Sequence, residues 1–175
     1  MSALKYIKKL WFSPKKNLGI VWKQKLIDLR KKPIVCKIEK PTRIDRARIL
    51  GYKAKQGYVI VQSRVGRGGM TRPKSSVRMG RKPKKYGFVH FTPSKSRQLM
   101  AEQRANRKYP NLEVLNSYYL AEDGKHKWYE IIMVDPCHPQ IMRDSKINWI
   151  CSRVHTRRVY RDLTSAGKKM RGLRK

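Results

Sequence analysis

The sequence predicts an α+β fold, in which a small antiparallel sheet of about three to four strands packs against a helix. N-terminal helices and long basic extensions are expected to flank this sheet. The prediction rests on a β-branched run at residues 57–65, a run of helix formers at 94–108, and an Asp-Gly pair between two further β-rich runs. The order strand, basic insert, helix and hairpin is typical of a small α+β domain.

Residues 1–33 are predicted to form a helical arm. Ser2 is suited to cap a first helix, and Pro14 begins a second one, because its missing N–H costs least in the first turn. The apolar face of the second helix consists of Leu18, Val21, Trp22, Leu26 and Leu29. Pro33 ends this helix. The two helices are expected to pack on each other or on a partner outside the chain.

A basic connecting segment follows at residues 34–56, most of it expected to be loop. The α+β core is predicted at 57–136. It begins with the strand at 57–65 and continues into a basic insert at 66–85 that has almost no apolar residues. Such a segment cannot bury enough surface to offset its ordering entropy, so we expect it to become ordered only against phosphates.

The rest of the core is predicted to be a helix and a hairpin. The helix covers 94–108, and strands at 111–121 and 127–134 are joined by a turn that contains Asp-Gly. In the second strand, both sets of alternating side chains are mainly apolar, so both faces are expected to be buried. Residues 137–175 are predicted to form a basic C-terminal extension.

The charge of the chain points to a polyanionic partner. There are 44 Lys and Arg against 11 Asp and Glu, a net charge of +33. Residues 1–50, 51–100 and 151–175 carry +12, +13 and +8, whereas residues 101–150 are neutral. Because this charge repels itself in water, a nucleic acid, an anionic membrane or an acidic protein is expected to belong to the working state. Without it, the basic arms are expected to have no fixed shape.

The membrane alternative is weak. No apolar run approaches the roughly 20 residues that span a bilayer, and Lys8 and Lys9 interrupt the N-terminal stretch where a secretory signal would need apolar residues. The three cysteines, Cys36, Cys137 and Cys151, are odd in number and widely spaced, which indicates free thiols in a reducing compartment. The chain is therefore expected in the cytosol or nucleus.

Neither catalysis nor metal binding is expected. No carboxylate pair has the spacing of a general acid and base, and there is no phosphate loop, dinucleotide fingerprint or nucleophile elbow. Cys137, His138, Cys151 and His155 are a weak zinc set, because adjacent side chains point apart in an extended chain. We predict no enzyme activity, no metal and no cofactor; magnesium would be associated with RNA and not held by protein ligands.

The basic insert and the aromatic residues after it form the most informative stretch. Its basic residues are Arg67, Arg72, Lys74, Arg78, Arg81, Lys82, Lys84 and Lys85. Guanidinium forks and ammonium groups match phosphate oxygens. Tyr86, Phe88 and Phe91 either stack on unpaired bases or pack in the core, and both alternatives stay open. RNA is favoured over DNA, because the basic residues lie on irregular segments and no DNA-binding motif is present.

A run of nineteen residues from Thr42 to Ile60, TRIDRARILGYKAKQGYVI, resembles the signature of a known family. Further matching segments follow the same order as in that family: Lys5-Tyr6-Ile7, Arg67-Gly68-Gly69, Ala101-Glu102-Gln103-Arg104-Ala105, Leu115-Asn116-Ser117-Tyr118-Tyr119, Val134-Asp135-Pro136 and the segment from Leu163 to Lys169. The family is the eukaryotic and archaeal large-subunit ribosomal protein fifteen, the "e" family, which is unrelated to the bacterial-type protein of the same number.

The resemblance implies a small α+β domain with arms buried in the RNA of the large subunit. It implies RNA contacts at Arg43, Arg46, Arg48, Lys53, Lys55, Arg67, Lys168, Lys169 and Arg171. We add Arg64, Arg157, Arg158 and Arg161 to the predicted RNA-binding set, together with the basic insert. Residues 14–40 match the family loosely. Family members usually continue beyond the position of Lys175 into a longer basic tail, whose contacts are expected to be either lost here or supplied by another molecule.

The function predicted from the sequence is that of a structural constituent of the large ribosomal subunit, which binds and stabilises ribosomal RNA. Its expected partners are that RNA and neighbouring large-subunit proteins, without a membrane or small-molecule substrate. The expected location is the cytoplasmic ribosome, after a nuclear or nucleolar assembly stage in a eukaryote. The alternatives are a general nucleic-acid condensing or RNA-chaperone protein and, with no candidate site, an RNA-modifying enzyme.

Overall fold

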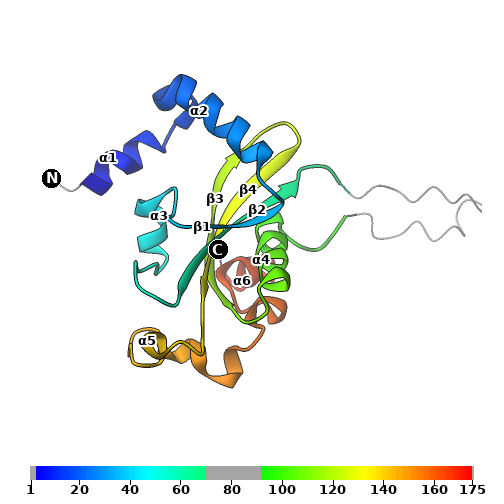
Figure 1. Ribbon diagram of the computed structural model, residues 1–175. Helices are drawn as coiled ribbons and strands as arrows, with labels where there is room; N and C mark the ends of the chain where they lie inside the picture. Colours follow the sequence, from blue (N-terminus) through cyan, green and yellow to red (C-terminus); the bar gives the residue numbers. More distant parts are fainter. Residues whose placement is uncertain (1–2, 70–91, 175) are drawn as a thin grey trace, which may run out of the picture.

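The computed structural model describes residues 3–69 and 92–174, which are built around one four-stranded antiparallel sheet (Figure 1). The strands lie in the order β1-β2-β4-β3. Their bounds are Val35–Ile38 for β1, Tyr58–Gly66 for β2, Glu113–Glu122 for β3 and His126–Val134 for β4. The α+β class and the antiparallel sheet predicted from the sequence are confirmed.

The β3–β4 hairpin lies where the Asp-Gly pair predicts it. In its turn, the Oδ1 atom of Asp123 accepts hydrogen bonds from the backbone N–H of Lys125 at 2.8 Å and of His126 at 2.6 Å. This bonding is the ordinary use of an Asp at the start of a turn. Strand β4 pairs with β2 along its whole length, from Tyr58 opposite Val134 to Gly66 opposite His126. It is therefore a central strand.

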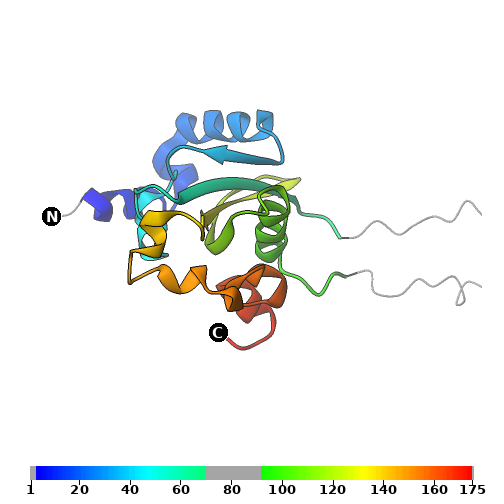
Figure 2. The same ribbon diagram turned by 60° about the horizontal axis from the view of Figure 1, so that its bottom comes forward.

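Both faces of the sheet are covered, as the alternation in β4 predicts. Figure 2 shows the sheet between α2 (Pro14–Lys31) on one side and α4 (Arg97–Lys108) on the other. Trp128 packs in the cluster that contains Trp22 of α2, whereas Ile131 packs in the cluster that contains Leu99 of α4. The predicted helix at 94–108 is confirmed. It begins slightly later than expected, after Ser96, whose Oγ accepts a hydrogen bond from the N–H of Leu99.

The N-terminal helices are confirmed, and they pack on each other and on the body of the protein. Helix α1 (Ala3–Leu10) leads through Ser13 into α2, which is kinked at Gly19, where φ is +45°. The rings of Trp11 and Trp22 meet edge to face, with centroids 5.8 Å apart. Of the described helices, none is long and apolar enough to cross a membrane.

Residues 34–54, which are expected to be mostly loop, contain two short elements that the sequence did not indicate, although about half of the segment lies outside helices and strands. The segment contains β1 and the helix α3 (Ile44–Ile49). Strand β1 is only four residues long, which is too short for alternation to show in the sequence. Helix α3 buries Ala47 completely against the sheet. Both elements form because β2 and its neighbours provide a surface to pack on, a tertiary effect that overrides weak local preference.

The C-terminal segment folds back against the sheet as a series of short helical turns. These are α5 (Pro139–Met142), η2 (Asn148–Cys151), η3 (Arg153–His155), η4 (Arg158–Arg161) and α6 (Ser165–Met170). Val159 and Ala166 are buried in the same cluster as Leu99. This packing is not expected from the sequence, in which the region is basic and poor in apolar residues. The wider division of the chain into arm, connecting segment, core and extension stays a prediction.

Candidate nucleic-acid interface

The distribution of acidic side chains is the main electrostatic feature of the protein. Of the eleven acidic residues, only Asp28 and Glu39 are exposed. Four are buried, namely Asp45, Glu102, Glu113 and Glu130. The folded surface is therefore more strongly basic than the net charge of +33 alone indicates. A surface of this kind attracts polyanions over its whole extent.

The buried carboxylates are held by polar partners inside the protein. Glu102 is fully buried and accepts hydrogen bonds from the hydroxyls of Ser117 and Thr164, the second at 2.6 Å. Burial raises the pKa of Glu102, although both hydroxyls and the nearby Arg158 oppose the increase. Since water does not reach this carboxylate, its role is structural.

Glu130 forms a second buried polar group on the opposite face of β4. It accepts hydrogen bonds from the Tyr118 hydroxyl and, at 3.0 Å, from the backbone N–H of Thr42. Burial is the largest cause that raises the pKa of Tyr118, followed by the charge of Glu130. The contact ties the segment before α3 to the sheet, and it thereby positions Arg43 and the arginines that follow.

Helix α3 presents two of the predicted RNA-binding residues to solvent. Asp45 and Ala47 are buried, whereas Arg46 and Arg48, two residues apart and therefore on different sides of this short helix, are exposed. No described acidic residue forms an ion pair with either arginine. Arg43, just before α3, pairs with Asp45 at 3.4 Å and lies over the ring of Trp11 at 5.2 Å. Arg46 and Arg48 therefore have no carboxylate partner among the described residues, whereas Arg43 already has one.

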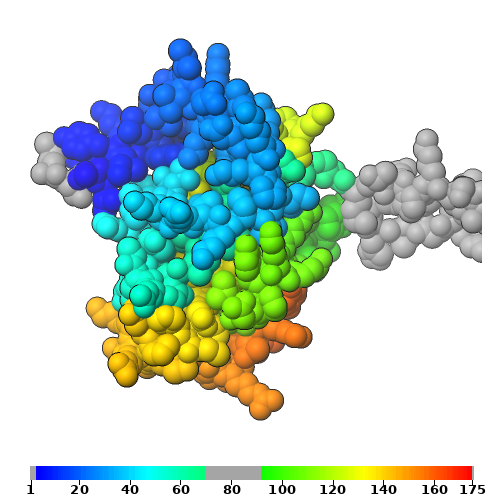
Figure 3. All heavy atoms as spheres, viewed as in Figure 1, coloured from blue at the N-terminus to red at the C-terminus, as the bar shows by residue number. Residues whose placement is uncertain are grey.

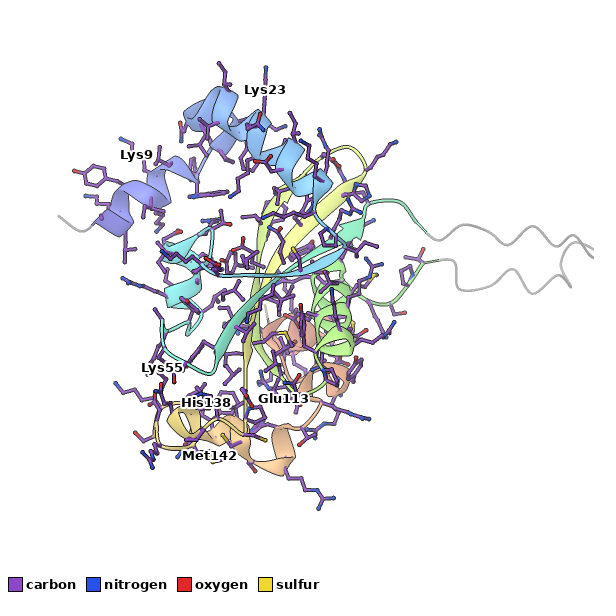
Figure 4. The ribbon with its side chains drawn as sticks, in the orientation of Figure 1. Lys9, Lys23, Lys55, Glu113, His138 and Met142 are labelled. Atoms are coloured by element: carbon purple, nitrogen blue, oxygen red, sulfur yellow. The ribbon has the colours of Figure 1, made fainter. Side chains whose placement is uncertain are left out.

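Lys53 and Lys55 are oriented by a carboxylate. Their Nζ atoms lie 2.8 and 2.6 Å from Oδ2 of Asp144, which follows α5. Both contacts hold the pKa of Asp144 well below its usual range. Gly57 allows the chain before β2 to pack closely on α5, because a Cβ at residue 57 would lie 2.5 Å from Cγ1 of Ile141. Figure 4 shows Lys55 and His138 at one end of the molecule, far from Lys9 and Lys23 on the N-terminal helices.

Arginines at the base of the basic insert bind backbone carbonyls. Arg64 donates to the carbonyl of Arg30 at 3.0 Å, and Arg67 donates to that of Asp123 at 2.7 Å. Arg97, at the start of α4, donates to the carbonyls of Gly66 at 3.1 Å, Arg67, and Gly68 at 3.3 Å. Arg97 was not among the predicted residues; nothing in its local sequence separates it from other basic residues.

The C-terminal basic residues divide into one buried and several exposed ones. Arg157, Arg161, Lys168, Lys169 and Arg171 are exposed. Arg161 still donates to two backbone carbonyls, those of Val154 and Thr156.

Arg158 is the buried member of the C-terminal group, 8% exposed. Its guanidinium donates to the carbonyls of Val114 at 2.6 Å and Leu115 at 3.0 Å. It is not accessible to a phosphate in this fold, and we leave it out of the RNA-contacting set. Adjacent Arg157 faces outward, which sequence spacing alone does not reveal.

Seven of the predicted RNA-binding residues lie outside the described residues: Arg72, Lys74, Arg78, Arg81, Lys82, Lys84 and Lys85. The question of whether Tyr86, Phe88 and Phe91 stack on bases also falls there. Conversely, the predicted set contains no residue before Arg43, although residues 1–33 carry ten basic residues and one acidic residue. Lys8, Lys9, Lys15, Lys16 and Lys23 are exposed on this arm. The pairs Lys8-Lys9 and Lys15-Lys16, on either side of Trp11 and Phe12 in the sequence, could have indicated this basic surface from the sequence alone.

The two histidines of the weak zinc set, His138 and His155, contact neighbouring groups of the protein. The Nδ1 atom of His138 accepts a hydrogen bond from the N–H of Gln140 at 3.2 Å and so caps α5. The ring of His155 lies edge to face on Trp149, with centroids 4.8 Å apart. Within residues 3–69 and 92–174, no group of three or more His, Cys, Asp or Glu side chains is placed to hold a metal ion.

A small α+β body with few exposed acids and many exposed arginines and lysines is typical of a basic protein that has a polyanionic partner. The family comparison is specific: the family model described as Ribosomal L15 matches residues 2–175. The chain belongs to this family, the one that the run from Thr42 to Ile60 resembles. Its members are proteins of the large ribosomal subunit and are generally structural constituents of the ribosome.

Proposed function

We propose that the chain binds ribosomal RNA at many separate points and stabilises the folded RNA of the large subunit. The observation that carries the proposal is the near absence of exposed carboxylates on a surface with outward-facing arginines and lysines. Phosphate contacts with release of counterions would supply most of the affinity, and the shape of the folded body would set the register.

The RNA-contacting set in this proposal begins with the exposed residues that have no ion pair to a described acid. These are Arg46, Arg48, Arg157, Lys168, Lys169 and Arg171. Arg43, Lys53, Lys55, Arg64, Arg67 and Arg161 are second, because each already has a partner within the protein. The predicted residues of the basic insert remain part of the proposed RNA-contacting set. No protein-bound cofactor is required, and assembly in the nucleolus would precede the cytoplasmic ribosome in a eukaryote.

Salt dependence tests the proposal. If about ten phosphates are contacted, the logarithm of the binding constant for ribosomal RNA should fall with the logarithm of salt concentration at a slope near −7, about −0.7 for each contact. A slope shallower than about −2 would contradict binding at many points.

The rival function is general nucleic-acid condensation. It predicts equal binding to a DNA duplex and to ribosomal RNA, whereas our proposal predicts preference for the folded RNA. In a cell lysate fractionated on a sucrose gradient, the chain should sediment with large subunits and remain there after a moderate salt wash. Release by the wash, or uniform distribution over nucleic acids, would favour the rival.

A further inference from the structure

The junction between α1 and α2 has an unusual surface for a folded protein. Phe12 is 89% exposed, and Tyr6 is 56% exposed. A large aromatic side chain left in water forgoes the stabilisation that burial of its apolar surface would give. Figure 3 shows α1 and α2 forming the outer rim of the molecule, away from the C-terminal helices. We expect a binding partner to cover the rings of Phe12 and Tyr6.

Phe12 separates two hollows. The first, of about 450 Å³, lies between the α1–α2 junction and β3, and Trp11, Arg43 and Tyr119 contribute to its walls. The second, of about 690 Å³, lies on the other side of the junction, beside Tyr6 and Lys9. Phe12 and Lys16 line both hollows. Each volume falls within the range of about 300–1,000 Å³ that is usual for ligand sites.

The charge around both hollows is nearly all positive. Lys15 and Lys16 line the first, and Lys8, Lys9 and Lys16 the second. The single acidic residue of the first hollow, Glu122, is already paired with Lys127 at 2.9 Å. Among the residues that the structure describes, no acidic residue lines the second hollow. An apolar protein surface placed here would bury several ammonium groups without partners, which is costly.

The walls are preorganised. Arg43 lies 5.2 Å from the ring centroid of Trp11, and Trp11 is held edge to face by buried Trp22. The ring of Tyr119 is held in the same way by Tyr129, with centroids 6.1 Å apart. Flat rings at fixed positions between lysines suit a ligand that has both flat apolar faces and negative charge. Unpaired nucleotides have both, because bases stack on aromatic rings and phosphates bind lysines. An acidic peptide supplies the charge through its carboxylates, but it has a flat apolar face only where it carries an aromatic side chain.

We infer that an unpaired stretch of RNA crosses the α1–α2 junction, with bases on the two sides of Phe12 and phosphates on the surrounding lysines. The inference rests on the proposed function and adds a type of contact that the phosphate-binding arginines do not provide. Base stacking tolerates different sequences, so the site selects single-stranded RNA by structure. It directs the N-terminal arm to a loop or bulge and not to a continuous helix.

The test measures binding of the full chain to two RNA hairpins of equal length and charge. One hairpin carries a three-nucleotide bulge with 2-aminopurine, a fluorescent base, at its centre; in the other, all stem nucleotides are paired. Phe12→Leu keeps an apolar side chain but removes the ring. It should weaken binding of the bulged RNA by about 5- to 150-fold, and should leave the paired RNA and the salt slope unchanged. Quenching of 2-aminopurine in the wild-type complex should decrease in the variant.

Phe12→Trp retains a stacking ring and should restore both affinity and quenching. Val154→Ala, which truncates another exposed apolar residue far from α1, is the matched control and should change neither. If Phe12→Leu lowers the affinity for both RNAs equally, or does not lower it for the bulged RNA, the inference is wrong. The proposed function would still stand in that case, provided that the wild type shows a steep salt slope. A shallow wild-type slope on both RNAs instead overturns the proposed function.

Discussion

Two pairs of basic residues, close together in the chain, have opposite surroundings. Arg46 and Arg48 project from α3 without an ion pair to a described acid, whereas Lys53 and Lys55 both bind Asp144. Under the proposed function, the lysines would have to exchange a carboxylate for a phosphate when RNA binds, whereas the arginines would release only counterions. The comparison shows that basic residues similar in sequence differ in their availability to RNA, and that the position of the acids decides the difference.

The same contrast occurs between the neighbours Arg157 and Arg158, and it gives the largest expected effect. Arg158→Ala removes the donors to three carbonyls, those of Val114, Leu115 and Leu163. It leaves these carbonyls without their donor and removes the positive charge that lowers the pKa of buried Glu102, so the free energy of unfolding should fall by about 3–5 kcal/mol. Denaturant unfolding measures the change. Arg157→Gln should leave stability within about 0.5 kcal/mol, and a similar loss in both variants would erase the contrast.

The next effect concerns the arginines of α3. Arg46→Gln with Arg48→Gln should reduce the salt slope of RNA binding by about 1.4 and lower affinity about tenfold, since two phosphate contacts are lost. Fluorescence anisotropy over a range of salt concentrations measures both quantities. Lys53→Gln with Lys55→Gln, a change of equal charge, should have a smaller effect on each. A larger effect of the lysine variant would show that the contact with Asp144 does not limit the contribution of Lys53 and Lys55 to RNA binding.

Removal of the acid should make the two pairs alike. Asp144→Asn releases Lys53 and Lys55, so affinity for ribosomal RNA should rise by about two- to fivefold and the salt slope should steepen. Asp28→Asn, at an exposed acid far from these lysines in the chain, controls for the general increase in charge. An equal rise in both variants would show that net charge, and not the release of particular lysines, sets the affinity.

The smallest effect depends on pH and tests the structural role of the buried acids. Because burial raises the pKa of Glu102 above its unfolded value, the stability contributed by the neutral carboxyl is present below about pH 4.5 and is lost as pH rises through the folded pKa. The wild type should therefore lose stability between pH 4 and pH 7, whereas Glu102→Gln, which does not titrate, should not show this loss. Thermal unfolding at both values measures this shift. Glu39→Gln, at an exposed acid, should lose stability as the wild type does.

Parts of the fold could be predicted because their signals are local. The Asp-Gly turn, the two apolar faces of β4 and the capped helix α4 each depend on residues next to one another in the chain. Strand β1 and helix α3 could not be predicted, since each is short and forms only where the sheet supports it. The same reason explains why the packing of η4 and α6 was missed.

The RNA-binding residues show the same division. Composition alone indicates a polyanionic partner, and the matching run from Thr42 to Ile60 indicates the family, because charge and residue order are properties of the chain itself. Which cations remain open to RNA depends on distances between residues far apart in sequence, such as Lys55 and Asp144 or Arg158 and Val114. Only the tertiary structure determines those distances, because only folding buries the acids and brings the remaining carboxylates and carbonyls next to particular basic residues.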